Sequence, residues 1–325
     1  MEAHSAAVVL IGNPNVGKSA LFGSLTGKYA TVSNYPGTTV EVTRGTASIG
    51  GRRWRVLDTP GTNGLTPMSE DEQVTRDILL TERGCAVIQV CDAKNLRRGL
   101  MLSAQLAEAK VPFVVALNMS DEAKARGIIV NAAKLSQALG VPVVETVAVQ
   151  RKGVRALAES VNGARSSLFI PRFDPAIETA IAEVEHLLPS DDSLGRRAIA
   201  LMLLTGDKSV RGHLEARLDE PKLERLDGLR RRLAAGYPES LRFVIARQRL
   251  VAVSRLHDAV VVRAGGERLA AALTIGHVDD ASMARPSAAR GDPLALLRVR
   301  RRSRRQGRSG LCREHCLLRS ADSAF

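Results

Sequence analysis

The chain has 325 residues, enough for two ordinary domains that each bury a sizeable core. Hydrophobic residues make up 45% of the sequence and charged residues 25%, a composition that is typical of folded globular proteins and excludes wholesale disorder. The net charge is +13, but residues 277–325 hold eleven arginines and five acidic residues, so this segment alone carries +6. The uneven distribution argues against a nucleic-acid-binding role for the whole chain.

The cysteines and the apolar runs indicate the cellular compartment. The four cysteines include no CxxC pair, and no charged and then apolar signal segment opens the sequence, which together favour a reducing cytoplasm. The longest apolar stretches, such as 111–117, have the length of a buried strand, whereas a spanning helix needs roughly 18–20 apolar residues. We therefore expect a cytoplasmic chain without a transmembrane segment.

In chain order, the first 165 residues alternate short apolar runs with longer amphipathic runs. This pattern predicts an α/β fold with a mostly parallel six-stranded sheet and helices on both faces. The expected strands are 6–11, 41–49, 53–58, 86–91, 111–117 and 141–147. The expected helices are 18–26, 70–80, 97–109, 131–139 and 154–161. Gly50 and Gly51 lie between the second and third strands and predict a hairpin, so one strand should run antiparallel.

From about residue 174 to residue 264 the strand pattern disappears, and Ala, Leu, Arg and Glu recur at helical spacing. Pro189, Pro221 and Pro238 divide this run into separate helices. The sequence therefore predicts one domain at 1–165, a small all-helical domain at 166–276 and an Arg-rich tail at 277–325. The tail lacks hydrophobic periodicity, so we expect it to be disordered.

A phosphate-binding loop is predicted at residues 12–19. They read Gly-Asn-Pro-Asn-Val-Gly-Lys-Ser, follow a predicted strand and open a predicted helix, as the pattern G-x-x-x-x-G-K-[ST] requires. The backbone N–H groups of such a loop surround the β-phosphate. Lys18 should reach the β- and γ-phosphates, and the Ser19 hydroxyl should take one Mg²⁺ position. The expected nucleotide-binding residues are Gly12, Asn13, Pro14, Asn15, Val16, Gly17, Lys18, Ser19 and Ala20.

A second nucleotide element ends the strand at 53–58. Asp58 is followed by Thr-Pro-Gly, and an acid at this distance behind a phosphate loop is expected to hold Mg²⁺ through water. Gly61 can present its backbone N–H to the γ-phosphate. The turn would therefore change when the γ-phosphate is hydrolysed.

The third element is Asn118-Met119-Ser120-Asp121, directly after the strand at 111–117. The Asp121 carboxylate can accept two N–H bonds from guanine, whereas adenine lacks this donor pair and would leave the carboxylate unpaired. Asn118 would brace the loop and contact the base. The third element therefore predicts guanine as the base.

Together these elements resemble a translation-factor-type small GTPase, and further segments resemble one family, FeoB, the bacterial ferrous iron transport protein B. Residues 34–41, Asn-Tyr-Pro-Gly-Thr-Thr-Val-Glu, resemble its switch I segment, and residues 65–72 resemble its switch II. Met119 stands where most GTPases carry Lys but FeoB carries Met. The resemblance covers about residues 6–160. The helical segment at 174–264 is similar in position and character to the helical domain of FeoB.

The resemblance implies a P-loop GTPase that hydrolyses GTP to GDP, with Mg²⁺ and K⁺ as cofactors. It implies that Thr39 completes the Mg²⁺ shell beside Ser19 and Asp58, with Gly37 and Thr38 in the same switch I segment. It also implies that Asn15 helps to coordinate K⁺ between the phosphates, supplying charge where other GTPases use an arginine finger. The residues expected to act in hydrolysis are Lys18, Thr39, Gly61 and Asn15.

One difference from GTPases of the Ras kind and two departures from the FeoB pattern change the expectations. Position 62 is Thr where a GTPase of the Ras kind places a water-orienting Gln, which suggests slow intrinsic hydrolysis. Asn63-Gly64 replaces the Tyr-Ser common in switch II of FeoB. Val147-Ala148-Val149 lies in the place of a guanine-contacting Ser-Ala segment; the Ala148 N–H can meet guanine O6, but without the usual hydroxyl we expect fast nucleotide release.

The resemblance implies guanine-nucleotide binding and GTP hydrolysis that regulate ferrous iron transport at the cytoplasmic membrane face, with a membrane permease domain as partner. FeoB continues into a membrane domain, whereas this sequence continues into the basic tail, so transport by this chain alone is not expected. Homo-oligomerisation stays open, and nucleic acid is expected only through the tail. The alternatives are a free-standing ribosome- or RNA-associated GTPase and a nucleotide-binding remnant without transport activity.

Overall fold

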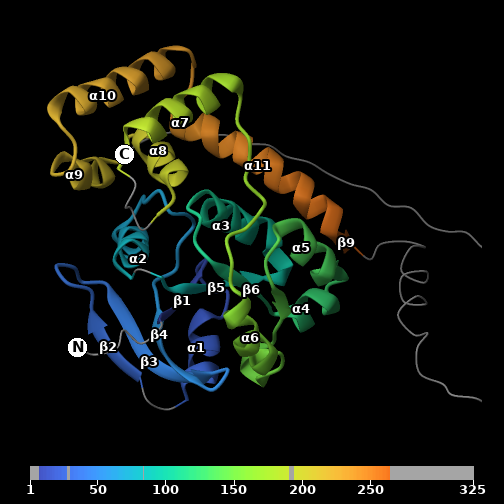
Figure 1. The fold of residues 1–325 in the computed structure, drawn as a ribbon. Helices are drawn as coiled ribbons and strands as arrows, with labels where there is room; N and C mark the ends of the chain where they lie inside the picture. The colour runs from blue at the N-terminus through green and yellow to red at the C-terminus, as the bar shows by residue number, and fades with distance from the viewer. Residues whose placement is uncertain (1–6, 28–29, 83, 190–193, 264–325) are drawn as a thin grey trace, which may run out of the picture. The chain divides into compact units, whose positions relative to one another are not determined.

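The computed structural model describes residues 7–27, 30–82, 84–189 and 194–263 (Figure 1). The Arg-rich tail predicted at 277–325 lies outside the described residues. No helix within the described ranges combines the length and the apolar composition that crossing a bilayer demands.

A seven-stranded sheet with the order β2-β3-β4-β1-β5-β6-β8 forms the centre of the first part (Figure 1). The strands are β1 Ala7–Gly12, β2 Ala30–Asn34, β3 Glu41–Ile49, β4 Arg52–Asp58, β5 Ala86–Asp92, β6 Phe113–Asn118 and β8 Val143–Glu145. The strands from β4 to β8 run parallel, and β3 runs antiparallel to both β2 and β4. The predicted mostly parallel sheet with one hairpin is therefore confirmed.

The predicted count of six strands is wrong, because β2 joins β3 at the edge of the sheet. All five residues of β2 are exposed, so the strand has no buried face to produce an alternating apolar pattern. A further strand, β7 (Ile128–Val130), pairs with β9 (Val261–Arg263) in a separate two-stranded sheet. The helical pattern predicted to extend to about residue 264 therefore ends at Val260, where β9 begins.

Helices cover both faces of the sheet. They are α1 Lys18–Thr26, α2 Glu70–Thr81, α3 Leu96–Glu108, α4 Ser120–Ala125, α5 Ala132–Leu139 and α6 Val154–Ser160. Short 3₁₀ turns lie at Ala93–Asn95, Ala148–Gln150 and Val161–Gly163. Alternate residues of β1 enter opposite cores: Val9 packs with residues of α2, α3 and α5, and Val8 packs with residues of α1 and α6. Because successive side chains of a buried strand point to opposite faces, β1 contributes to one core on each side of the sheet.

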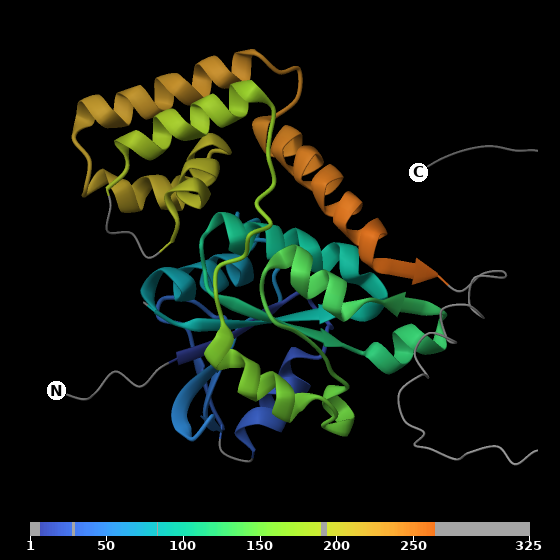
Figure 2. The same ribbon diagram turned by 45° about the vertical axis from the view of Figure 1, so that its right-hand side comes forward.

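The second part of the chain is a set of helices that continues the core on the α3 side of the sheet. These helices are α7 Pro175–Leu187, α8 Arg196–Leu204, α9 Lys208–Glu215, α10 Glu220–Ala235 and α11 Leu241–Val260. Pro175 and Pro221 lie in the first turns of α7 and α10, where the missing N–H is tolerated. The predicted divisions are confirmed: Pro221 lies at the start of α10, Pro189 follows the end of α7, and Pro238 lies between α10 and α11. Figure 2 shows α11 passing from these helices to β9, beside the first part of the chain.

Side-chain caps fix the starts of four of these helices. The acceptors are Asp174, Asp207, Asp219 and Ser240. Partial burial would raise the pKa of Asp174, but hydrogen bonds from Tyr237, Gln248 and backbone N–H groups outweigh it and lower that pKa. The same environment raises the pKa of Tyr237 to about 12, through desolvation and its hydrogen bond to the carboxylate.

Candidate nucleotide-binding site

The loop between β1 and α1 has the conformation that phosphate binding requires. Asn15 and Gly17 adopt left-handed backbone angles, with φ of 64° and 85°, and such turns point successive N–H groups into one concavity. A Cβ on Gly12 would lie 2.5 Å from the Val90 carbonyl oxygen, and one on Gly17 would lie 2.4 Å from Asn118 Nδ2. Glycine at these positions therefore lets the loop lie close to β5 and to the guanine element.

Lys18 and Asp58 meet at the foot of this loop. The Lys18 Nζ lies 3.6 Å from Asp58 Oδ1, and the Asp58 side chain is 7% exposed. That Oδ1 is buried and accepts no hydrogen bond from any described residue. A buried carboxylate oxygen without a donor is unfavourable unless a cation lies near it, and Mg²⁺ prefers oxygen ligands. Ser19, the second residue of α1, is exposed next to Lys18, so its hydroxyl and the Asp58 carboxylate form a donor set that fits Mg²⁺.

The turn after Asp58 packs directly on the phosphate loop. A Cβ on Gly61 would lie 2.9 Å from Pro14 Cα, and the Thr62 N–H donates to the Gly12 carbonyl at 3.0 Å. The Asn13 Nδ2 donates to the Thr62 carbonyl at 3.1 Å. The first two predicted elements are therefore brought together by backbone and amide contacts.

Thr62 cannot take the place of a water-orienting glutamine in this arrangement. Its side chain is fully buried, and its hydroxyl donates to the Gly64 carbonyl at 2.6 Å. Asn63 stands where switch II of FeoB commonly has tyrosine, and it forms hydrogen bonds with two side chains. Its Oδ1 accepts from Arg98 Nη2 at 2.6 Å, and its backbone N–H donates to Glu72 Oε1 at 3.0 Å. These two contacts define the geometry of the Asn63-Gly64 segment.

Switch I forms a turn closed by its own hydrogen bonds. The Thr38 N–H and Oγ1 both donate to the Tyr35 carbonyl at 3.0 Å, and the Val40 N–H donates to Thr38 Oγ1 at 3.2 Å. Gly37 provides the φ of 78° inside the turn. Thr38 is thus engaged in the turn, and the neighbouring Thr39 is exposed. Among the described residues, no hydrogen bond joins Thr39 to the phosphate loop.

Asn118 connects the guanine element to both neighbouring loops. Its Nδ2 donates to the Val16 carbonyl at 2.9 Å, and its Oδ1 accepts from the Ala148 N–H at 3.0 Å. The Thr146 hydroxyl also donates to this Oδ1, at 3.2 Å. Thr146 is a site residue that sequence analysis missed, and it supplies a hydroxyl one residue ahead of the segment that lacks one. Its position next to Val147 was the available signal.

The carboxylate predicted to recognise the base lies in the first turn of α4. Asp121 is exposed, and its Oδ2 accepts from Gln150 Nε2 at 3.4 Å. Val149, in the same 3₁₀ turn as Gln150, is 81% exposed. The exposed carboxylate and apolar side chain leave this edge open to a base.

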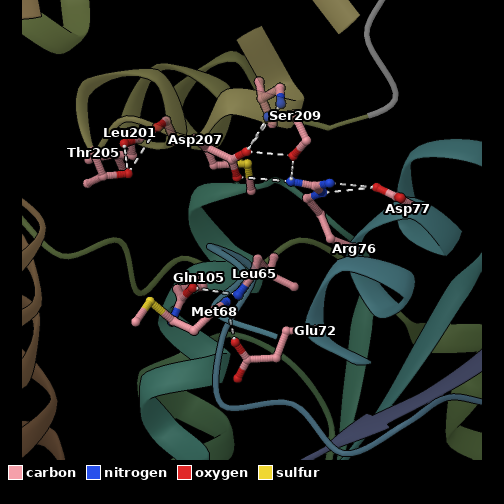
Figure 3. A network of polar contacts seen from close by, with 12 residues as sticks. Leu65, Met68, Glu72, Arg76, Asp77, Gln105, Leu201, Thr205, Asp207 and Ser209 are labelled. Carbon is pink, nitrogen blue, oxygen red and sulfur yellow. Dashed lines mark hydrogen bonds and ion pairs between the residues drawn. The ribbon is translucent and has the colours of Figure 1, made fainter. Parts of the chain in front are cut away.

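The loop of switch II that precedes α2 is hydrogen-bonded to α2 and α3, and α2 in turn is hydrogen-bonded to the helical part (Figure 3). The Leu65 N–H donates to Gln105 Oε1 at 2.7 Å, and the Met68 N–H donates to Glu72 Oε2 at 2.8 Å. One turn further along α2, Arg76 Nη1 donates to Asp207 Oδ2 at 2.9 Å and to Ser209 Oγ at 2.7 Å. The contacts of Leu65 with Gln105 and of Arg76 with the start of α9 connect residues far apart in the sequence, so sequence analysis had no signal for them.

Family models match both parts of the chain. The model of ferrous iron transport protein B matches residues 6–161, and the model of the FeoB cytosolic helical domain matches residues 173–262. The Fe(2+) transport protein A/Fe(2+) transporter FeoB fusion protein of Porphyromonas gingivalis is 37% identical over 218 residues, which are 64% of this chain and 26% of that protein. The Fe(2+) transporter FeoB of Escherichia coli is 34% identical over 247 residues, 70% of this chain and 32% of that protein. The chain thus spans about a third or less of the length of these relatives.

Solved structures agree with these matches. A mutant of S. thermophilus NFeoB bound to GDP is similar with a TM-score of 0.71 and 31% identity, covering 79% of this chain and 100% of that chain. The cytosolic domain of L. pneumophila FeoB is similar with a TM-score of 0.71 and 28% identity, covering 79% of this chain and 100% of that chain. The predicted P-loop GTPase fold with an all-helical second part is confirmed. The chain therefore belongs to the ferrous iron transport protein B family, and its first part is the GTPase domain of that family.

Proposed function

We propose that this chain binds guanine nucleotide, hydrolyses GTP and thereby regulates ferrous iron transport at the cytoplasmic face of a membrane, together with a permease domain. The observation that carries the proposal is the Asn118 amide, which joins the phosphate loop at Val16 to the guanine segment at Ala148. The names of the relatives, Fe(2+) transporter FeoB, support the link to iron, and the GDP in a solved relative supports the nucleotide. The proposed domains are 1–165 and 166–276.

The nucleotide would lie along the loop from Gly12 to Ala20. Lys18 would bind the β- and γ-phosphates, and the Gly61 N–H would meet the γ-phosphate. Ser19, Thr39 and Asp58 would hold Mg²⁺, which when bound offsets the negative charge of the phosphates. Asn15, exposed on the left-handed turn of the loop, would offer its amide oxygen to K⁺.

Hydrolysis is expected to be slow because no side chain at position 62 faces the phosphates. The Thr62 hydroxyl is committed to the Gly64 carbonyl, so backbone groups near Gly61 would hold the attacking water. The hydrogen bonds of Asn63 to Arg98 and Glu72 would keep this backbone in place. The rate should therefore respond to the cation near Asn15 more than to any single side chain of switch II.

Single-turnover GTP hydrolysis in KCl and in NaCl at equal ionic strength tests the proposal. We expect measurable hydrolysis in both salts, at least about tenfold faster in KCl, and loss of that difference in Asn15→Ala. Lys18→Ala should abolish tight triphosphate binding. A wild-type chain that binds GTP but does not hydrolyse it in either salt would be a nucleotide-binding remnant, and equal rates in the two salts would contradict the K⁺ assignment.

A further inference from the structure

Lys94 is a largely buried cation next to the guanine element. It lies in the 3₁₀ turn Ala93–Asn95 that follows β5, and its side chain is 12% exposed. Its Nζ lies 2.5 Å from Glu122 Oε2, 3.3 Å from Met119 Sδ and 3.9 Å from Asp92 Oδ1. One ammonium group thus contacts three segments: the loop after β6 that holds Met119, here called the guanine loop (residues 118–121), the first turn of α4 and the end of β5.

The backbone of the 3₁₀ turn holds this ammonium in place. The Lys94 N–H donates to Asp92 Oδ1 at 2.9 Å, and Asn95 Nδ2 donates to Asp92 Oδ2 at 2.9 Å. Asp92 thereby caps the turn with both carboxylate oxygens. Because β5 and β6 are parallel neighbours, the end of β5 lies beside the end of β6, where the guanine loop begins.

Met119 lies between Lys94 and the phosphate loop. It is a non-glycine residue with a φ of 58°, a conformation that neighbouring contacts must maintain. Its Cε would lie 3.7 Å from a Cβ on Gly17, so the thioether packs beside the phosphate loop. Its sulfur, a weak acceptor, faces the Lys94 ammonium.

Three carboxylates lie around the Lys94 ammonium or close to it. Asp92, Asp121 and Glu122 bring three carboxylates to the edge where a nucleotide with several negative charges would bind. Lys94 pairs with the first and the last of these carboxylates. Without it, the two freed carboxylates would repel both Asp121 and the phosphates.

We propose that Lys94 is a positioning residue for guanine-nucleotide binding, which supplies from the β5 loop the positive charge that the guanine loop lacks at Met119. It holds Met119 against the phosphate loop and holds the first turn of α4, which carries Asp121. The inference rests on the proposed binding of guanine nucleotide. Loss of the charge should therefore speed nucleotide release and leave hydrolysis of the bound nucleotide unchanged.

Release of a fluorescent mant-GDP from the full chain, measured by stopped flow, tests the inference. We expect release roughly tenfold faster in Lys94→Met than in the wild type, and close to wild type in Lys94→Arg. The double variant Lys94→Met/Met119→Lys, which moves the charge into the loop, should recover most of the loss. Lys124→Met is the matched control, because Lys124 lies on α4, pairs with Glu145 of β8 at 2.6 Å and is 60% exposed.

Two further readouts separate positioning from a structural effect. The single-turnover rate at saturating GTP and the unfolding midpoint of the nucleotide-free chain should both stay unchanged in Lys94→Met. Wild-type release in Lys94→Met, or equal acceleration in Lys124→Met, overturns the inference alone. A fall in the unfolding midpoint without rescue by either second variant also overturns it. A wild-type chain that takes up no mant-GDP overturns the proposed function, and the inference with it.

Discussion

At the scale of single residues, Asn118 links two loops of the candidate site, in addition to its predicted contact with the base. Its side chain is 2% exposed, and it joins the phosphate loop to the segment after β8 through one donor and one shared acceptor. The third predicted element is therefore part of the scaffold of the site, and Asp121 beside it is left exposed. In this loop the buried Asn118 holds the backbone in place, and the exposed Asp121 is the candidate for recognising the base.

Asp121→Asn should change base preference from guanine to xanthine. The carboxylate can accept from the N1 and N2 amino edge of guanine, whereas an amide would place a donor against those donors. We expect GDP affinity to fall by at least about tenfold and XDP affinity to rise. Competition of GDP and XDP against mant-GDP measures both, with Glu159→Gln on the exposed face of α6 as control. An unchanged preference for GDP in Asp121→Asn would contradict the assignment.

At the scale of elements, α2 connects switch II to the helical part. Ser69 caps its first turn, which contains Glu70, Asp71 and Glu72, where acidic residues favour a helix N-terminus. Glu72 and Arg76 are four residues apart and lie on one side of the helix. Glu72 binds the switch II loop and Arg76 binds the start of α9 (Figure 3). A movement of the loop would therefore act on α9 through a single helix.

Arg76→Met should uncouple α9 from the nucleotide. In the wild type, we expect backbone amide exchange in residues 208–215 to differ between the GDP state and a state with a non-hydrolysable GTP analogue. The substitution removes the donor to Asp207 and Ser209, so that difference should shrink by at least about half. Hydrogen exchange with mass spectrometry measures it. Arg55→Met, which removes an exposed pair with Glu82 at the other end of α2, should leave the difference intact. Retention of the full difference in Arg76→Met would exclude this route.

The elements show what could and could not be predicted from sequence. The phosphate loop, Asp58 and Asn118 were predictable because their chemistry is local and follows a buried strand in each case. Strand β2 was missed because its side chains are all exposed, and only pairing with β3 defines it. The bond between Arg76 and Asp207 joins residues 131 positions apart, so it depends on packing that no local pattern encodes. Lys94 was missed for the same reason, because Met119 and Glu122, which its ammonium contacts, lie 25 and 28 positions away in the sequence.

At the scale of the described part of the molecule, the GTPase domain and the helical part share a buried junction. Arg249 of α11 donates to both carboxylate oxygens of Glu108 at the end of α3, at 3.1 and 2.9 Å. Gly195 donates its N–H to the Ala109 carbonyl at 2.7 Å, and a Cβ there would lie 3.0 Å from that backbone. Phe173 lies against the Arg249 guanidinium, with the guanidinium carbon 5.7 Å from the ring centroid. The junction therefore combines a close backbone approach at Gly195 with a buried ion pair between Arg249 and Glu108.

Loss of one partner in this junction should be far more destabilising than loss of a surface pair. The Glu108 and Arg249 side chains are 2% and 8% exposed, and an acid at a helix C-terminus is disfavoured by the helix dipole as well as by burial. Arg249→Met would leave the carboxylate buried without its cation. We expect the free energy of unfolding to fall by about 3–5 kcal/mol.

Urea denaturation of the nucleotide-free chain measures the effect, and the same helix offers a control. Arg247 pairs with Glu239 at 2.9 Å but is 56% exposed, so Arg247→Met should change the free energy of unfolding by less than about 1 kcal/mol. The double variant Glu108→Gln/Arg249→Met removes both charges and should recover part of the loss. Equal effects of Arg249→Met and Arg247→Met would mean that water reaches the junction in solution. In that case α11 would be held to α3 by its apolar side chains alone.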